Sequence, residues 1–360
     1  MRWMWAFALM WGCEGSIVFG DKDDSGTDTA TSSSSSGTTG TTSSGTSSTG
    51  TTTRTTDTTS KPAANPALPG DFEVYVDTVD IDIGPRQGEA EPVVETRVYL
   101  PRGAKGGSPV IVFNHGFNMG PADYASYGQH LASHGFAVLM PRWDEGLFSS
   151  RTHVELAADL NQMVDWLDRV DGAQAKLAEA IDASRVGLAG HSRGGKQAIQ
   201  SGLSRDDVGA IFTVDPVDSA PPGGFFDDRD YPSMTPERIG DLTVPFGMIG
   251  AGLGSEGFVP CAPESDNFEQ YYIHSSSPVW LYVFPEAGHQ DFTDPCADAP
   301  SVVSCSTCSY SDQPARYRDL APILMVPFFQ LHLNGVVGYQ DWVDAPEEAI
   351  EDVPILVTHK

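Results

Sequence analysis

The sequence predicts an α/β protein with a mostly parallel sheet that is covered by helices on both faces. Strand-like and helix-like segments alternate along most of the chain, which is typical of parallel sheets. Two of the strand-like segments, SPVIVFNHG and FAVLMPRWD, contain short continuous apolar runs, as strands buried on both faces do. In such a sheet, reactive groups are expected at the carboxyl ends of the strands.

The expected strands are recognised by apolar or alternating residues between turn-forming ones. The first two have partly alternating polarity and are expected to pair as an antiparallel edge. In chain order, the strands are expected within residues 72–83, 93–100, 108–116, 136–144, 184–190, 208–215, 243–252 and 278–289.

The expected helices carry apolar residues near the helical spacing. Gly135 is expected to end the first of them. Pro322 or Pro327 is expected to interrupt the last, because proline cannot continue a helix without losing a hydrogen bond. In chain order, the helices are expected within residues 123–135, 154–170, 194–204 and 315–335.

The N-terminal part has a composition that cannot form a core. Residues 21–60 are almost entirely Ser, Thr and Gly, so they have little apolar surface to offset the entropy lost on ordering. We interpret residues 14–66 as a flexible tether. Residues 67–360 are then long enough for one large α/β domain.

The first residues, MRWMWAFALMWGCEGS, combine Arg2, a short apolar stretch and a cysteine. The apolar stretch is too short to span a bilayer as a mature helix. Residues 1–13 resemble a bacterial lipoprotein signal that is cleaved before Cys13, whose thiol would carry the lipid. The alternative is an ordinary secretory signal or a misplaced start. We expect an exported protein, anchored to a membrane by its lipid and held off the surface by the tether.

The charge is strongly acidic, with 21 Lys and Arg against 49 Asp and Glu and a formal net charge of −28. A chain this acidic is repelled by phosphate backbones, so nucleic acid is excluded as a partner. The charge says nothing about the reaction.

Four of the five cysteines lie in the expected domain. An even number in an exported protein predicts two disulfides, with three possible pairings among Cys261, Cys296, Cys305 and Cys308. The CxxC spacing of Cys305 and Cys308 also suggests zinc. That interpretation is disfavoured, because a tetrahedral site needs two further ligands and the sequence has no second CxxC or spaced His pair.

The segment VGLAGHSRGGKQAIQ contains a GxSxG motif around Ser192. Ser192 follows an expected buried strand and precedes an expected helix, which is the setting of a nucleophile elbow in an α/β-hydrolase fold. A side chain at Gly190 or Gly194 would crowd the closely packed strand and helix. The helix N-terminus behind Ser192 favours developing negative charge.

A serine nucleophile needs a base and an acid. His289, in the loop after a late strand, is the expected base by the chain order Ser, acid, His. Asp215 ends the strand VGAIFTVD and is the preferred acid, Asp218 is its rival, and Glu256 is a third option. Among the other histidines, His115 is expected to organise its own loop, and side chains of neighbours at the elbow, such as His191, are expected to diverge. The remaining candidates, His274, His332 and His359, lack a strand-end context.

The oxyanion requires two preorganised donors. The backbone N–H of Arg193, directly after the nucleophile, is expected to supply one. The loop NHGFNMG should supply the other, with the N–H of Phe117 as the expected donor.

These motifs resemble more than a fold. GHSRGGK, VDPVD, GLG followed by PCAPE, and a later GH-x-D occur in this order in plant chlorophyllases. The resemblance covers roughly residues 109–294, and it implies Ser192 as nucleophile, Asp215 or Asp218 as acid and His289 as base. The interval from Ser192 to Asp215 also resembles that of platelet-activating-factor acetylhydrolases, and polyester hydrolases share the overall fold. The segments 219–241 and 294–312 depart from the chlorophyllase pattern, so the chemistry carries over better than the substrate.

We therefore expect a serine-dependent carboxylic ester hydrolase that forms an acyl-enzyme on an ester with an apolar part and requires no metal or organic cofactor. Two alternatives stay open: a non-catalytic binding module of a surface lipoprotein, and a peptidase or acyltransferase with the same triad. The sequence does not give the oligomeric state. Apolar pocket walls are expected from Phe117, Met119, Tyr124, Trp143, Phe225 and Phe226.

Overall fold

The computed structural model describes residues 63–85, 93–143, 151–170, 174–220, 227–257, 260–276, 278–298, 305, 307–346, 350 and 352–360. The predicted signal with Cys13, most of the predicted tether, and Phe225 and Phe226 lie outside these residues. Within them, every helix is too short or too polar to cross a membrane.

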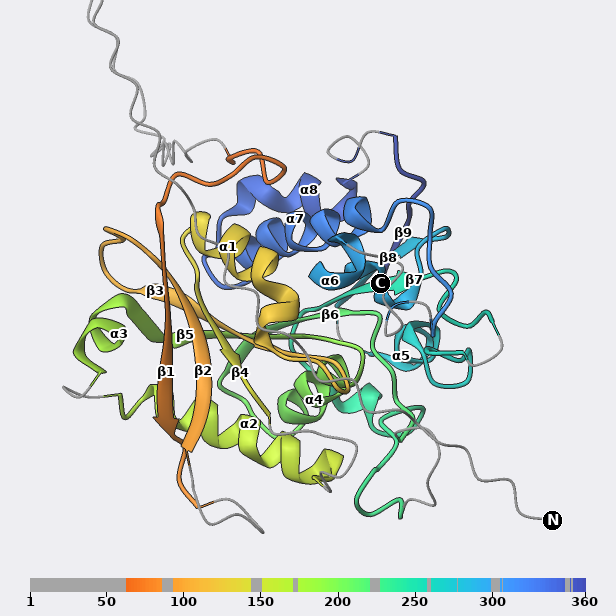
Figure 1. Ribbon diagram of the computed structural model, residues 1–360, viewed down its shortest axis with the longest axis horizontal. Helices are drawn as coiled ribbons and strands as arrows, with labels where there is room; N and C mark the ends of the chain where they lie inside the picture. The colour runs from red at the N-terminus through yellow and green to blue at the C-terminus, as the bar shows by residue number, and fades with distance from the viewer. Residues whose placement is uncertain are drawn as a thin grey trace, which may run out of the picture. The chain divides into compact units, whose positions relative to one another are not determined.

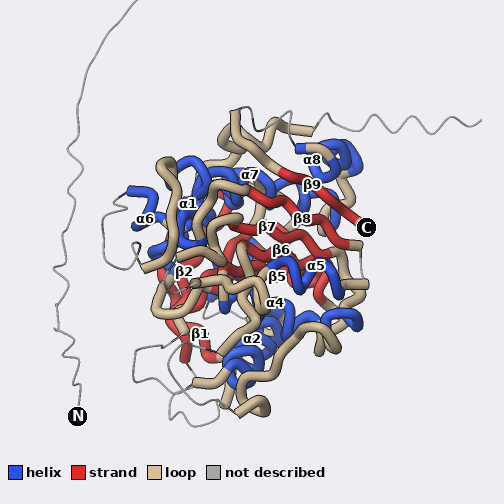
Figure 2. The backbone as a smooth tube through the Cα atoms, turned by 90° about the vertical axis from the view of Figure 1, so that its right-hand side faces the viewer, coloured by secondary structure: helices blue, strands red, loops and turns tan. Residues whose placement is uncertain are grey.

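The described residues form one sheet in the strand order β1-β2-β4-β3-β5-β6-β7-β8-β9. The six strands from β4 to β8 in this order are parallel, and β1, β2 and β9 add antiparallel edges. Figure 2 shows the strands fanned into the twist of an open sheet. The strands are β1 (Val74–Asp82), β2 (Val93–Pro101), β3 (Ser108–Asn114), β4 (Ala137–Pro141), β5 (Ile181–His191), β6 (Val208–Val214), β7 (Phe246–Ala251), β8 (Val279–Phe284) and β9 (Leu356–His359).

Helices cover both faces of the sheet (Figure 1). The buried apolar side chains form two core clusters. Side chains of α2, α3, α4 and α5 belong to one cluster, and those of α1, α7 and α8 belong to the other. The predicted α/β architecture is therefore confirmed. The helices are α1 (Ala125–Ser133), α2 (His153–Leu167), α3 (Ala175–Ala180), α4 (Arg193–Gly202), α5 (Phe268–His274), α6 (Asp294–Asp298), α7 (Pro314–His332) and α8 (Gln340–Asp344).

Two local predictions are confirmed. Strands β1 and β2 pair as an antiparallel edge over their full lengths. Gly135 has φ +97° and follows the last turn of α1. In this left-handed conformation its N–H donates to the carbonyl of Ala132 at 3.0 Å, which ends the helix as a glycine cap does.

The predicted interruption of the last helix is wrong. α7 runs without a break through Pro322 and Pro327. The hydrogen bonds lost at the prolines are offset by tertiary packing, since Phe328 and Phe329 are fully buried on the sheet. A side chain at Gly187 of β5 would lie 2.7 Å from the Phe329 ring, so the strand itself makes room for the helix.

Two disulfides join Cys261 to Cys308 and Cys296 to Cys305, as the number of cysteines predicted. The CxxC pair is thus divided between two different bonds. Cys261 lies in the loop after β7, and Cys308 lies in the segment before α7. The first bond therefore ties together two loops that follow different strands.

The two bonds are expected to differ in their contribution to stability. The bond Cys261–Cys308 spans 47 residues and Cys296–Cys305 spans 9. By loop-closure entropy, removing the first should lower the free energy of unfolding by about 4 kcal/mol and removing the second by about 2.5 kcal/mol. Urea unfolding of C261S/C308S and C296S/C305S measures both losses under identical conditions. Equal losses, or a larger loss from the shorter loop, would contradict this account.

Candidate active site

Ser192 lies between β5 and α4 in a strained backbone conformation, with φ +56° and ψ −125°. Such a conformation costs on the order of 1–3 kcal/mol and persists only where the surroundings hold it. The Ser192 N–H donates to the carbonyl of Val214 on β6 at 2.9 Å, and its own carbonyl accepts from Gly195 and Lys196 in the first turn of α4. The strand and the helix together hold the turn.

Gly190 and Gly194 permit the close packing around this turn. A Cβ at Gly190 would lie 2.4 Å from the Gly194 carbonyl carbon, and one at Gly194 would lie 2.1 Å from the carbonyl oxygen of Asn114. The loop after β3 is therefore pressed against the first turn of α4. No residue with a side chain fits either position without moving backbone.

The side chains of Ser192, His289 and Asp215 form a continuous hydrogen-bonded chain. His289 Nδ1 lies 2.6 Å from Asp215 Oδ2, and His289 Nε2 lies 2.9 Å from Ser192 Oγ. A carboxylate only accepts, so Nδ1 carries the proton and Nε2 is left to accept the hydroxyl proton of Ser192. Asp215 Oδ1 accepts a further hydrogen bond from the Ala251 N–H at 3.0 Å, which fixes the carboxylate.

These three residues come from the carboxyl ends of β5, β6 and β8, which meet at one edge of the parallel sheet. Asp215 directly follows β6 and has φ +41°, a second positive value beside that of Ser192. His289 begins the short 3-10 helix η4 (His289–Phe292) after β8. The sequence-predicted nucleophile, acid and base are thus brought together.

The loop that carries His289 is held by buried polar contacts. Asp291 Oδ2 accepts hydrogen bonds from the N–H groups of Gly288 and Ser311, at 2.7 Å and 2.8 Å. Burial raises the pKa of Asp291 above its usual value and outweighs these hydrogen bonds, which act in the opposite direction. A Cβ at Gly288 would lie only 2.0 Å from the carbonyl oxygen of Ser309, so the segment next to Cys308 packs directly on the loop.

Asp218, the rival acid, faces a different group. Its carboxylate lies 3.1 Å from Lys196 Nζ, and both side chains are almost completely buried. It also accepts from the N–H groups of Met234 and Thr235 and from the Ser233 hydroxyl. Burial raises the pKa of Asp218, but the Lys196 charge and these donors outweigh it and hold the pKa below its usual value. The third option, Glu256, is exposed.

Gly116, in the loop after β3, is held by hydrogen bonds on both sides of its peptide. Its N–H donates to Tyr124 Oη at 3.1 Å, and its carbonyl accepts from Arg193 Nη2 at 3.3 Å. The Arg193 guanidinium also lies 5.1 Å from the centre of the Phe117 ring. Burial lowers the pKa of Arg193 to about 9. The loop with Phe117 and the first residue of α4 are therefore in direct contact.

His115 organises its own loop, as predicted. Its Nε2 accepts from the Trp143 N–H at 3.1 Å, so its Nδ1 donates to the Gly116 carbonyl at 2.9 Å. Burial lowers the pKa of His115 to about 3, which keeps the ring neutral. Trp143 and Tyr124 were expected to be pocket walls, but both are fully buried supports of this loop. Phe117 and Met119 are half-buried.

His191 has a larger part in the site than the sequence indicated. Its ring packs on the base, with 4.7 Å between the His191 and His289 ring centres. Its Nε2 lies 2.9 Å from the His289 carbonyl oxygen and its Nδ1 lies 2.8 Å from Tyr124 Oη. The only available signal was its position between Gly190 and Ser192 at the end of a buried strand.

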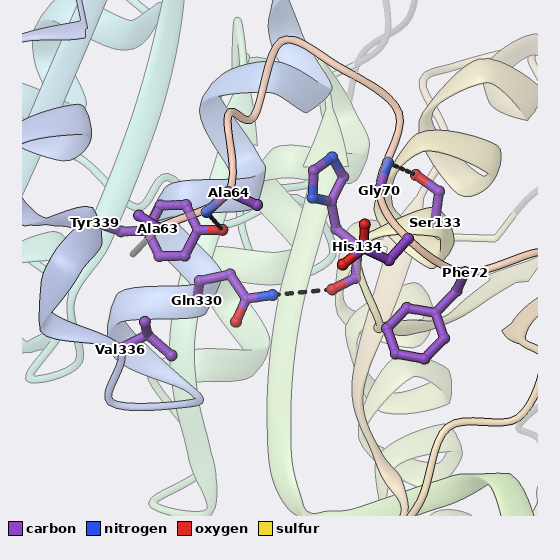
Figure 3. A pocket seen from close by; sticks show the side chains of 10 residues that line it. Ala63, Ala64, Gly70, Phe72, Ser133, His134, Gln330, Val336 and Tyr339 are labelled. Carbon is purple, nitrogen blue, oxygen red and sulfur yellow. Dashed lines mark hydrogen bonds between the residues drawn. The ribbon is translucent and has the colours of Figure 1, made fainter. Parts of the chain in front are cut away.

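Two cavities lie outside the hydrogen-bonded chain. One of about 260 Å³ lies between the segment before β1, the C-terminal end of α1 and α7 (Figure 3). The other, of about 470 Å³, lies beside the segment after β6 and is lined in part by Asp218 and Tyr231. Among the described residues, no group of three or more His, Cys, Asp or Glu side chains is placed to hold a metal ion.

Comparison with known proteins gives a consistent family. The chlorophyllase family model matches residues 69–350. Chlorophyllase type 0 of Chenopodium album is 29% identical over 241 residues, which cover 63% of this chain and 68% of the relative. Chlorophyllase-1 of Citrus unshiu is 33% identical over 55% of this chain and 59% of the relative. Cutinase est1 of Thermobifida alba is 26% identical over 45% of this chain and 46% of the relative.

Replacing Asp218 should destabilise the fold. In D218N the buried Lys196 charge loses its partner, which typically costs about 3–5 kcal/mol. Since the pKa of Asp218 is lowered in the folded chain, its stabilisation is fully present above the unfolded pKa of about 3.9 and is lost as the pH falls through the folded pKa. Urea unfolding should therefore show a large difference between wild type and D218N at pH 7 and a shrinking difference below about pH 4.

The matched control is D227N. Asp227 pairs with Arg229 in an exposed position. This substitution should therefore leave the unfolding midpoint unchanged both at pH 7 and below about pH 4. A D218N protein as stable as wild type at pH 7 would show that the Lys196 pair contributes nothing.

Proposed function

The chain belongs to the chlorophyllase family of ester hydrolases, and on that premise we propose that it cleaves carboxylic esters with Ser192 as nucleophile, His289 as base and Asp215 as acid. The observation that carries the proposal is the unbroken hydrogen-bonded chain from Asp215 through His289 to Ser192 Oγ. A serine hydroxyl is a poor nucleophile unless an adjacent base takes its proton, and His289 Nε2 lies within that reach.

In the proposed reaction, Ser192 Oγ attacks the ester carbonyl carbon as its proton passes to His289 Nε2. Asp215 holds the tautomer of His289 and stabilises the imidazolium that forms. His289 then gives the proton to the leaving alcohol, and the acyl group stays on Ser192. Water activated by the same histidine attacks the acyl-enzyme, releases the acid and restores the hydroxyl.

We propose the backbone N–H groups of Arg193 and Phe117 as the donors to the oxyanion. The support is their setting, because Arg193 opens α4 directly after the nucleophile and its side chain contacts both Gly116 and Phe117. The N-terminus of α4 adds a partial positive charge at the same point. Removing one donor of this kind typically costs about 2.7–4 kcal/mol of transition-state stabilisation.

The proposed substrate is an ester with an apolar part. The relatives that the chain resembles are named chlorophyllases and cutinases. The half-buried Phe117, which packs on the Arg193 guanidinium, and the half-buried Met119 in the same loop are apolar as well.

We further propose that the protein is exported and anchored through a lipid on Cys13, with residues 67–360 as its catalytic domain. This proposal rests on the composition of the N-terminal residues. It predicts no change in the chemistry at Ser192, only the place where it occurs.

Ser192→Ala should abolish ester hydrolysis. In a serine protease with the same type of triad, removing single triad residues lowers kcat by about 10⁴-fold to 10⁶-fold. The alanine also lacks the attacking oxygen. The measurement is hydrolysis of p-nitrophenyl esters from short to long acyl chains by the full chain, with fluorophosphonate labelling in parallel. Wild type should be labelled and S192A should not. S265A, at an exposed serine, should behave as wild type in both assays, and hydrolysis retained by S192A would refute the mechanism.

Asp215→Asn should separate the two candidate acids. The asparagine amide favours the wrong tautomer of His289, and the equivalent change in a serine protease lowers kcat roughly 10⁴-fold. Stopped-flow measurement of kcat per folded molecule compares D215N with D218N. We expect D218N to keep kcat within about tenfold of wild type once the folded fraction is counted, because its carboxylate faces Lys196. The reverse order of the two losses would make Asp218 the acid.

A further inference from the structure

Two loops must be held at a fixed separation for the proposed reaction. One carries His289, and the other carries Gly116 and the proposed donor Phe117. The two loops are far apart in sequence, and they are joined through two buried side chains. His191 Nε2 lies 2.9 Å from the carbonyl oxygen of His289, and His191 Nδ1 lies 2.8 Å from Tyr124 Oη. Tyr124 Oη in turn accepts from the Gly116 N–H at 3.1 Å.

The direction of each hydrogen bond follows from its partners. The His289 carbonyl can only accept, so His191 Nε2 carries the proton and donates. In the neutral ring Nδ1 is then an acceptor, and it must receive the Tyr124 hydroxyl proton. The Tyr124 oxygen remains free to accept the Gly116 N–H. These directions give a continuous series of hydrogen bonds from Gly116 through Tyr124 and His191 to His289.

The surroundings hold this chain in one arrangement. Tyr124 and His191 are both fully buried. A Cβ added at Gly116 would lie 3.2 Å from His191 Nδ1 and 3.2 Å from Tyr124 Oη, so the three groups are in close contact. The Tyr124 ring packs on Phe113 of β3, with 4.9 Å between the ring centres. The Tyr124 hydroxyl also lies 3.0 Å from Met119 Sδ. A thioether sulfur is a weak acceptor, so His191 Nδ1 is the stronger partner for the hydroxyl proton.

We propose that His191 and Tyr124 are positioning residues that couple the loop of the base His289 to the oxyanion loop at Gly116. The inference rests on the proposed function, because it assigns these residues to the geometry of that reaction. Neither side chain touches the reacting atoms. They set the distance between the imidazole that moves the proton and the peptide that receives the negative charge.

Burial and the neighbouring His289 lower the pKa of His191 well below its usual value. The ring therefore stays neutral while His289 becomes an imidazolium during the reaction. A second charge on the adjacent ring would oppose that imidazolium, and a proton on Nδ1 would prevent it from accepting the Tyr124 hydroxyl proton. The hydrogen-bond pattern and the charge requirement thus favour the same tautomer.

The experiment compares Y124F, H191F and the double variant Y124F/H191F in the full chain. Each single variant breaks the same series, so each should lower kcat about tenfold to hundredfold, as expected for displaced groups, with KM within about twofold. The double variant should be no slower than the slower single variant. Y282F is the matched control, since the buried Tyr282 hydroxyl donates to the Val343 carbonyl at 2.7 Å outside this series, and it should keep kcat.

Thermal unfolding of each variant distinguishes lost positioning from lost stability. Y282F and Y124F each lose one buried hydroxyl, so similar losses of stability with a loss of kcat only in Y124F support the proposal. Wild-type kcat in either single variant, or losses that multiply in the double variant, would overturn it. If wild type neither hydrolysed esters nor reacted with the fluorophosphonate, that result would instead refute the proposed function.

A second measurement does not depend on activity or on the folding of H191F. In wild-type protein with ¹⁵N-labelled histidine, NMR should show His191 as the neutral Nε2–H tautomer at neutral pH. Y124F should move the Nδ1 resonance of His191 and also shift the His289 signals. An Nδ1–H tautomer, an imidazolium at neutral pH, or unmoved His289 signals in Y124F would overturn the coupling.

Discussion

The left-handed backbone conformation of Ser192 is the constraint on which the rest of the site depends. At φ +56° the chain turns sharply enough for the hydroxyl to leave the strand and for α4 to start at the next residue. The turn is possible only because Gly190 and Gly194 have no side chains where strand, helix and the β3 loop meet. Asp215, at φ +41°, repeats the device at the end of the adjacent strand. Two strained residues on neighbouring strands therefore point their side chains into the same space.

The helix that follows Ser192 is completely buried and contains two cationic side chains. All ten residues of α4 are buried, including Arg193 and Lys196 near its N-terminus. A cation at that end is opposed by the helix dipole, so each needs compensation. Asp218 supplies it for Lys196 through an ion pair. Arg193 lies over the Phe117 ring and donates to the Gly116 carbonyl. The compensation thus ties the helix to the segments after β6 and β3, the same segments that frame Ser192.

The sheet and the turn at Ser192 could be predicted from the sequence, because both depend on local patterns. Apolar runs identify the central strands, and glycines on both sides of a serine at a strand end identify the turn. The choice between Asp215 and Asp218 stayed open, because both follow the same strand and only the fold decides which carboxylate faces His289. His191 was given no role, since spacing along the chain says where a side chain leaves the strand but not what it meets. The predicted interruption of α7 was wrong for a related reason. The hydrogen bonds that the prolines remove are a local loss, and the burial of Phe328 and Phe329, which outweighs it, depends on the fold.

The two loops that flank Ser192 are both held by buried hydrogen bonds, and the segment that packs on the loop of His289 is held by a disulfide as well. The loop of His289 sits against Ser309 and Ser311, a segment that the Cys261–Cys308 bond ties to the loop after β7. In the loop of Gly116, the Gly116 N–H donates to Tyr124 Oη and the Gly116 carbonyl accepts from the Arg193 guanidinium, and both partners are buried. Preorganised groups stabilise developing charge because they need not reorganise when it appears. The loop of His289 therefore combines the hydrogen bonds that Asp291 accepts with the covalent link of the segment packed on it. The position of the Gly116 loop depends on its hydrogen bonds with the buried Tyr124 and Arg193, so a change at either side chain acts directly on the peptides that are proposed to bind the oxyanion.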